Sequence, residues 1–168
     1  MVAAVVLAAG ASTRFGSPKQ RLLLEPVLER VRAASEIRDV VVVLGAHDVE
    51  TTVQAVRCPD WERGPGASLR CGLGALPDDA EAAVVVLADG PHLAPAAIDR
   101  VVRAWRESGT EVLAATYGGG ERSHPVLLAR AAWGRVPDEG ARALAATLVR
   151  CDDLDSPGDV DVAGDLPS

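Results

Sequence analysis

Short apolar runs alternate with amphipathic segments along most of the chain. Residues 2–8, 40–44, 84–87 and 112–116 are rich in Val, Leu and Ala with almost no polar interruption, which is typical of strands buried on both faces of a sheet. The segments between them carry apolar residues at helical spacing. This alternation predicts an α/β fold of three layers, in which helices cover both faces of a mostly parallel, Rossmann-like sheet.

Five helices are expected around these strands. The first has apolar residues at the i, i+3, i+4 and i+7 positions of one face, and Pro26 suits its first position because a first helical residue needs no N–H partner. Pro95 is expected to begin the fourth helix for the same reason. The expected helices lie at residues 24–31, 49–56, 67–76, 95–105 and 138–148.

The later part of the chain contains one reversal of direction. Gly118, Gly119 and Gly120 predict a turn, after which residues 125–128 return as an antiparallel partner strand. No linker, repeat or low-complexity block interrupts the chain, so residues 1–168 are expected to form one domain. Because ligands of such sheets bind at the carboxyl ends of the strands, the site is expected in the loops that follow Leu7, Leu44, Leu87 and Thr116.

Composition and charge narrow the class of partner and the compartment. The net charge of −7 argues against a nucleic-acid partner, which would need a basic surface, and no apolar run is long enough to cross a membrane. Cys58, Cys71 and Cys151 form no C-x-x-C pair, so they are expected to be free thiols in a reducing compartment. The apolar N-terminal segment lacks the basic region of a signal peptide, and a cytoplasmic protein is therefore expected.

The loop after the first strand has the composition of an anion-binding loop but matches neither common phosphate motif. Five residues separate Gly10 from Gly16 and Lys19 follows three residues later, which excludes a P-loop, and G-x-G-x-x-G is missing. The glycines allow close approach of the main chain to a ligand, while Arg14 and Lys19 supply positive charge. On these residues alone, a triphosphate-binding loop and an ordinary strand–helix loop with surface charges both remain open.

The loop and several later segments carry a set of short sequence blocks. They are Leu7-Ala8-Ala9-Gly10-x-Ser12-x-Arg14-Phe15-Gly16-x-x-Lys19, Pro59-Asp60-Trp61-Glu62 with Gly64, Ala67-Ser68-Leu69-Arg70-x-Gly72, Leu87-Ala88-Asp89-x-Pro91, His124-Pro125-Val126-Leu127, Asp138-Glu139-Gly140-Ala141-Arg142 and Asp153-Leu154-Asp155-Ser156-Pro157-x-Asp159. Together these blocks resemble the signature of the MobA-like nucleotidyltransferases, which include molybdenum cofactor cytidylyl- and guanylyltransferases. The resemblance covers nearly the whole chain; the departures are a shorter segment between Lys19 and Pro26, Cys58 where the family often has Asn, and Ser123 where Gly is usual.

The resemblance implies a sheet of the nucleotidyltransferase type and a magnesium-dependent reaction. A nucleotidyl group would pass from a nucleoside triphosphate to a small phosphorylated acceptor, molybdopterin or the molybdenum cofactor, with release of pyrophosphate. In the family, Ala as the third residue of the first block goes with CTP, so Ala9 favours CTP over GTP. A molybdenum hydroxylase is the protein partner that the resemblance suggests.

The same resemblance assigns roles to individual residues. Arg14, Lys19 and Asp89 are the implied catalytic residues. The triphosphate and base would contact Leu7, Ala8, Ala9, Gly10, Arg14, Lys19 and Ser68. The acceptor would contact Arg122, His124 and Arg142. Asp89 and Asp155 are the implied metal ligands, and Asp153 is the next candidate after Asp155.

The residues by themselves leave some of these roles open. Asp89 follows an apolar strand, where a carboxylate suits Mg²⁺, but Asp before Gly-Pro also occurs in plain turns and helix caps. Ser68 could read a base edge or simply cap a helix. A lone histidine beside proline, as at His124, is often a hydrogen-bonding loop residue rather than a catalyst.

Three other functions remain as alternatives. A sugar phosphate or another small phosphate could replace the molybdenum cofactor as acceptor, because one fold serves many substrates. A nicotinamide- or flavin-dependent oxidoreductase is disfavoured by the missing dinucleotide fingerprint. A non-catalytic accessory protein of a molybdenum hydroxylase would bind its partner or cofactor and release no pyrophosphate.

Overall fold

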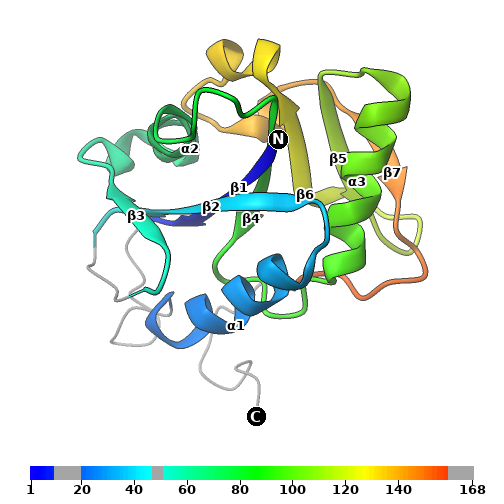
Figure 1. Ribbon diagram of the computed structural model, residues 1–168, viewed down its shortest axis with the longest axis horizontal. Coiled ribbons are helices and arrows are strands. Elements are labelled where there is room, and N and C mark those ends of the chain that lie inside the picture. The colour runs from blue at the N-terminus through cyan, green and yellow to red at the C-terminus, as the bar shows by residue number, and fades with distance from the viewer. Residues whose placement is uncertain (10–19, 47–50, 159–168) are drawn as a thin grey trace.

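The computed structural model describes residues 1–9, 20–46 and 51–158. These residues form a seven-stranded sheet with the order β3-β2-β1-β4-β6-β5-β7 and helices packed against it (Figure 1). The strands are Val2–Ala8 (β1), Ile37–Leu44 (β2), Gln54–Arg57 (β3), Ala82–Leu87 (β4), Val112–Thr116 (β5), Arg122–Ala129 (β6) and Thr147–Arg150 (β7). The helices are Gln20–Ala33 (α1), Pro65–Gly74 (α2) and Pro95–Ser108 (α3), with short 3₁₀ turns at Trp61–Arg63 (η1), Arg130–Arg135 (η2) and Ala141–Ala143 (η3).

The strand directions confirm the predicted mixed sheet. β1 pairs in parallel with β2 and β4, and β5 pairs in parallel with β7. β6 runs antiparallel to both of its neighbours, β4 and β5. The start of β6 therefore lies at the same edge of the sheet as the carboxyl ends of β1 and β4.

Helices cover both faces of this sheet, which confirms the three layers. α1 and α3 pack on one face and α2 packs on the other (Figure 1). Burial of the branched side chains of β1, β2 and β4 on both faces supplies the main stabilisation, at roughly 25 cal/mol per Å² of apolar surface. Gly72 lets α2 approach closely, since a Cβ there would lie 2.6 Å from Val5 Cγ1 and 2.7 Å from Val43 Cγ2.

The predicted helix at residues 49–56 is wrong where the structure describes it. Gln54–Arg57 is the edge strand β3, which pairs in parallel with β2, while Val49 lies outside the described residues. The spacing of Val53 and Val56 fits a helix, but in so short a segment pairing with the open edge of β2 outweighs the local pattern.

The predicted helix at residues 138–148 is also wrong. Ala141–Ala143 is one 3₁₀ turn, and Thr147–Arg150 is the edge strand β7 beside β5. The alanine-rich sequence favours a helix, but Gly140 has φ +98° and begins the turn. Pairing with the free edge of β5 then determines the conformation of the residues that follow.

The remaining elements agree with the sequence apart from their ends. α1 begins before Pro26, which lies inside the helix instead of at its start; the fully buried face that includes Val27 and Val31 offsets the lost hydrogen bond. α3 begins at Pro95 as predicted, and Gly118 and Gly119 have the positive φ of a turn. Within the described residues, no helix has the length and apolarity needed to cross a membrane.

Candidate active site

Three adjoining pockets lie at the carboxyl edge of the sheet, and Leu87 at the end of β4 lines all three. The strand-end pocket has a volume of about 140 Å³ and lies between the ends of β1 and β4 and the start of α2. The loop pocket, about 370 Å³, lies between α2, β6 and residues 139–142. The tail pocket, about 350 Å³, lies between β4, β6 and residues 156–158. The site is therefore one extended cleft at the edge where ligands of such sheets bind.

The strand-end pocket gathers residues from three distant parts of the chain that the sequence assigned to the nucleotide and metal. Leu7, Ala9, Ser68 and Asp89 line it together. Ser68 is almost fully buried in the first turn of α2, and Asp89 is half-buried just after β4. The parallel pairing of β1 with β4, which sets Leu7 opposite Leu87, explains why these loops meet.

Other residues of the predicted nucleotide site are placed differently or not described. Ala8 is buried in the core beneath the cleft. The carbonyl of Leu7 accepts the N–H of Ala88 at 3.0 Å, so Leu7 contributes its side chain to the pocket. Gly10, Arg14 and Lys19 lie outside the described residues.

The loop pocket brings together all three predicted acceptor residues, Arg122, His124 and Arg142. The guanidinium of Arg122 donates to the carbonyl of Leu144 at 2.5 Å and to that of Ala141 at 3.3 Å, which fixes it in the pocket wall. Its burial lowers its pKa below the usual value. Arg142 is exposed at the mouth.

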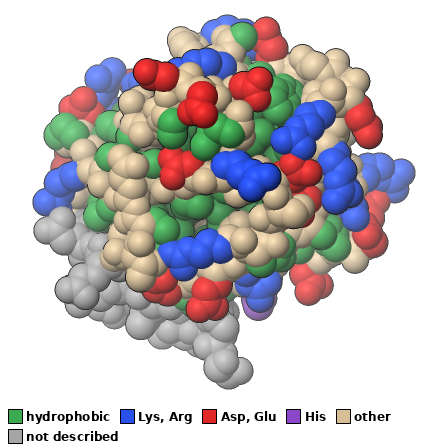
Figure 2. Space-filling model, in the orientation of Figure 1, with side chains coloured by type: hydrophobic (Ala, Val, Ile, Leu, Met, Phe, Trp, Pro, Cys, Tyr) green, Lys and Arg blue, Asp and Glu red, His purple; other side chains and the backbone are tan. Residues whose placement is uncertain are grey.

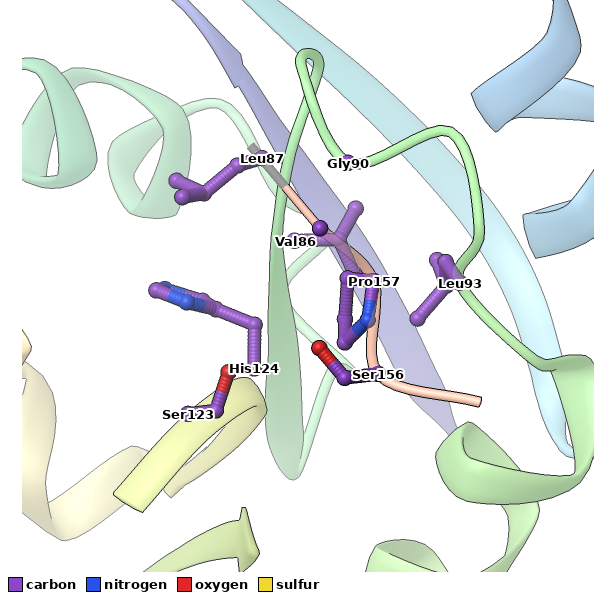
Figure 3. Close-up of a pocket in the computed structure, with 9 residues that line it drawn as sticks. Val86, Leu87, Gly90, Leu93, Ser123, His124, Ser156 and Pro157 are labelled. Carbon is purple, nitrogen blue, oxygen red and sulfur yellow. The ribbon is translucent and has the colours of Figure 1, made fainter. Parts of the chain in front are cut away.

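His124 lies between the loop pocket and the tail pocket and lines both (Figure 3). Burial, and secondly the charge of Arg122, lower the pKa of His124 to about 4. The hydroxyl of Tyr117 donates to the His124 carbonyl at 2.7 Å, and the His124–Pro125 peptide bond is cis. At neutral pH the ring is therefore an uncharged hydrogen-bonding group beside a fixed cation.

The wall of the loop pocket joins two sequence blocks into one packed unit. Gly66 donates its N–H to the Asp138 carbonyl at 2.9 Å, and a Cβ on Gly66 would lie 1.6 Å from the Pro137 carbonyl oxygen. Arg70 forms an ion pair with Asp138 at 2.5 Å and donates to the Val136 carbonyl at 2.8 Å. Hydrogen bonding from Arg70 holds the pKa of Asp138 below its usual range.

Residues 151–158, which we call the tail strap, include Asp155, the second predicted metal ligand, and reach the tail pocket with Ser156, Pro157 and Gly158. The N–H of His92 donates to the Pro157 carbonyl at 2.9 Å, and Pro157 packs against Gly90, where a Cβ would lie 3.0 Å from it. Figure 3 shows Ser156 and Pro157 across the tail pocket from Ser123 and His124 of β6. Asp155, next to Ser156, is exposed.

The carboxylate of Asp153 is engaged elsewhere. Its two oxygens accept hydrogen bonds from Arg100 at 2.6 and 3.0 Å, and this contact lowers the pKa of Asp153 to about 2. Of the two acidic residues in the strap that the sequence offered as ligands, Asp153 is therefore paired with Arg100, which leaves Asp155 as the candidate.

The chemistry of Asp89 and Asp155 fits a divalent cation that is held mainly by a nucleotide. No group of three His, Cys, Asp or Glu side chains suited to a metal occurs among the described residues. Mg²⁺, however, usually takes one or two protein carboxylates and completes its shell with water and phosphate oxygens. Asp89 and Asp155 come from segments that touch through Gly90 and Pro157, and carboxylates are the protein donors that such a cation takes.

The face of the molecule shown in Figure 2 has no continuous basic surface. Arg side chains are interspersed with Asp and Glu on it. The three cysteines are free, as expected, and Cys58 is fully buried with its Sγ 3.6 Å from the Ala67 carbonyl oxygen. The departure from the family pattern at Cys58 is therefore a core position under α2.

Sequence reasoning missed the residues that hold the site together. Arg70 and Asp138 both lie in blocks that carry the resemblance, but nothing in the sequence pairs them. Arg100 and Tyr117 belong to none of the sequence blocks. Arg100 binds Asp153, 53 residues later in the chain, and Tyr117 binds the His124 carbonyl across the glycine turn. Only the long-range contacts of the structure identify these roles.

Comparison with known proteins agrees with this geometry. A family model described as the MobA-like NTP transferase domain matches residues 4–151. No curated protein matches the chain. Among solved structures, Rv0371c from Mycobacterium tuberculosis H37Rv is 28% identical with a TM-score of 0.80, covering 98% of this chain and 94% of that one.

Two further solved structures bear on the site. The Rv0371c complex with manganese, from the same organism, is 26% identical with a TM-score of 0.76, covering 98% of this chain and 95% of that one. CMP:2-keto-3-deoxy-manno-octonic acid synthetase complexed with CTP is 12% identical with a TM-score of 0.75, covering 97% and 94%. At that identity the second likeness shows a shared fold alone.

Proposed function

The chain belongs to the MobA-like NTP transferase family, and from this premise we propose that it transfers a cytidylyl group from CTP to molybdopterin or the molybdenum cofactor, with Mg²⁺. The observation that carries the proposal is the joining of two chemically different pockets at one edge of the sheet. The strand-end pocket holds Asp89 and small residues, and the loop pocket holds Arg122, His124 and Arg142. One cleft thus offers a place for each of two substrates.

The nucleotide is assigned to the strand-end pocket. Leu7 and Ala9 are small or apolar and leave room for a base, while the buried Ser68 can offer a hydroxyl to its edge. Arg14 and Lys19 are proposed to contact the triphosphate, as the resemblance implies. CTP is favoured because Ala stands at position 9.

The acceptor phosphate is assigned to the loop pocket. Arg is suited to paired recognition of phosphate oxygens, and Arg122 is already fixed by two carbonyl groups. Neutral His124 can donate one N–H to the same phosphate without adding charge. The exposed Arg142 can close on the acceptor from the mouth.

The reaction needs positioning more than proton transfer. An acceptor phosphate oxygen attacks the α-phosphorus of the triphosphate, the bond to the bridging oxygen breaks, and pyrophosphate leaves from the opposite side. A phosphomonoester loses its second proton near pH 6, so the nucleophile is ionised at neutral pH and no general base is required. The main barrier is repulsion between two anions, which fixed cationic side chains reduce.

A divalent cation, when bound, would neutralise part of the triphosphate charge and align it for attack. Asp89 and Asp155 are proposed to hold it, with Asp89 as the principal ligand. The manganese complex of Rv0371c supports a divalent cation in this family. We further propose that the reaction takes place in the cytoplasm and that a molybdenum hydroxylase receives the product.

The test is pyrophosphate release from each of the four nucleoside triphosphates with Mg²⁺, with and without molybdopterin. Asp89→Asn is expected to lower kcat by roughly 10²–10³, the scale for loss of one preorganised electrostatic group. Asp78→Asn is the matched control, because Asp78 is exposed at the opposite end of β4 and should leave kcat unchanged.

Three results would contradict parts of this proposal. Release of pyrophosphate only with a sugar phosphate would replace the acceptor. Thermal stabilisation by GTP but not CTP would reverse the base preference, because a ligand that binds the folded state raises its apparent stability. Binding of cofactor or hydroxylase without pyrophosphate from any triphosphate would reject the reaction itself.

A further inference from the structure

The tail strap is held at both ends by backbone hydrogen bonds. At its start the N–H of Cys151 donates to the carbonyl of Thr116 at 2.8 Å, which continues the pairing of β7 with β5. Near its end the carbonyl of Pro157 accepts the N–H of His92 at 2.9 Å. Between these points the strap leaves the edge of the sheet and crosses to the turn that follows Asp89.

A single side chain of α3 fixes the direction in which the strap leaves β7. Arg100 donates through Nη1 to the Arg150 carbonyl at 3.1 Å and to Asp153 Oδ1 at 2.6 Å, and through Nη2 to Asp153 Oδ2 at 3.0 Å. This is a two-pronged pairing of a planar guanidinium with a carboxylate, which restricts orientation as well as distance.

A stabilising role does not account well for this contact. The Asp153 side chain is 68% exposed, and ion pairs between exposed side chains contribute little to folding. The contact instead orders the chain two residues before Asp155. Asp152 orders it further, because its carboxylate accepts the N–H of Gly119 at 3.2 Å.

We propose that Arg100 is a positioning residue for the cation site, acting through Asp153 to order the strap that carries Asp155 past the turn after Asp89. The inference rests on the proposed function, because it takes Asp155 as the second carboxylate of that site. Arg100 itself touches neither substrate nor cation. In this proposal the carboxylate of Asp153 supports the strap through Arg100, and the carboxylate of Asp155 remains available to the cation.

The test measures cation binding directly in the chain of residues 1–168. Mn²⁺ affinity is followed by electron paramagnetic resonance in the presence of the non-hydrolysable analogue α,β-methylene-CTP. Arg100→Gln is expected to weaken Mn²⁺ binding by about 10- to 100-fold, the usual cost of losing a residue that orients a metal ligand. The KM for Mg²⁺ should rise while kcat at saturating Mg²⁺ is largely kept, and the unfolding midpoint should change little.

Two companion variants separate positioning from general damage. Arg103→Gln, an exposed position on the same helix, should bind Mn²⁺ like the wild type. Asp153→Asn should match Arg100→Gln, and the double variant should lose no more than either single one, because both changes remove one contact. Unchanged Mn²⁺ affinity in Arg100→Gln, an equal loss in Arg103→Gln, or additive losses in the double variant would each overturn the inference.

The outcome also distinguishes the inference from the function on which it rests. If the wild type releases pyrophosphate while Arg100→Gln binds Mn²⁺ normally, the inference fails and the function stands. If Arg100→Gln weakens Mn²⁺ binding but the wild type releases no pyrophosphate, the function fails and the positioning role stands. A wild type that binds no Mn²⁺ with the analogue overturns both.

Discussion

The pKa of His124 makes the stability of the fold depend on pH in a window where few other groups titrate. Histidine in an unfolded chain titrates near pH 6.5, whereas burial, followed by the charge of Arg122, lowers the pKa of His124 to about 4 in the folded protein. Between these values the unfolded chain binds a proton that the folded chain does not. Falling pH therefore favours unfolding, and the stability contributed by neutral His124 is complete only above about pH 6.5.

The magnitude follows from the two pKa values. Linkage gives a loss of about 2 kcal/mol at pH 5 relative to pH 7.5, and about 3 kcal/mol once the pH is below 4. His124→Gln removes the titrating ring while keeping an amide that can hydrogen-bond. The variant should therefore be less sensitive than the wild type to a fall from pH 7.5 to pH 5, by about 2 kcal/mol.

Urea unfolding at pH 7.5, 6.5, 5.5 and 5.0, followed by the fluorescence of the three tryptophans, measures this difference. Asp138, Asp152 and Asp153 have lowered pKa values and are stabilising while ionised, so their contribution is lost only as the pH falls below about 4. These three carboxylates contribute equally to the stability of the wild type and of His124→Gln, and their contribution changes only below the pH range that is measured. Parallel pH profiles for wild type and His124→Gln would refute the assignment of a neutral His124 with a lowered pKa.

Two further predictions concern the walls of the cleft. Gly66→Ala should destabilise the protein by about 1–3 kcal/mol, because its Cβ would lie 1.6 Å from the Pro137 carbonyl oxygen. A Cβ on Gly74, in the same helix, would have no neighbour within 4 Å, so Gly74→Ala should be neutral or stabilising. Equal urea midpoints for the two variants would contradict this packing. Tyr117→Phe should cost about 1 kcal/mol in urea unfolding, since it leaves the His124 carbonyl without the hydroxyl that donates to it at 2.7 Å, and an unchanged midpoint would show that this hydrogen bond contributes nothing.

The central strands could be predicted from sequence because burial on both faces leaves a continuous apolar run. β1 is predicted with its observed ends, and β4 within two residues. The edge strands β3 and β7 could not be predicted, because each has four residues, most of them exposed. In such short, exposed segments the hydrophobic pattern is weak, and pairing with the open edge of a strand from elsewhere in the sequence determines the conformation.

The sequence names candidate residues for the site but not the contacts that hold them in place. The resemblance named Leu7, Ser68 and Asp89, and the structure places all three in one pocket. It gave no indication that Arg70 binds Asp138, or that Arg100 binds Asp153, since these partners are 68 and 53 residues apart. Such pairs arise from the packing of whole elements, which a single sequence does not reveal.

The reversed direction of β6 brings its first residues to the edge of the sheet where the proposed function needs a second binding site. Had β6 run parallel to β4, its first residues would lie at the opposite edge, some 26 Å away for eight residues at about 3.3 Å each. Running antiparallel, it presents Arg122 and His124 from its start beside Leu87 at the end of β4. Asp89 thus follows a strand that ends at the cleft, whereas Arg122 and the neutral His124 open a strand that begins there. The proposed reaction brings two anions together and would use both groups, the carboxylate for a cation at the triphosphate and the guanidinium for the acceptor phosphate.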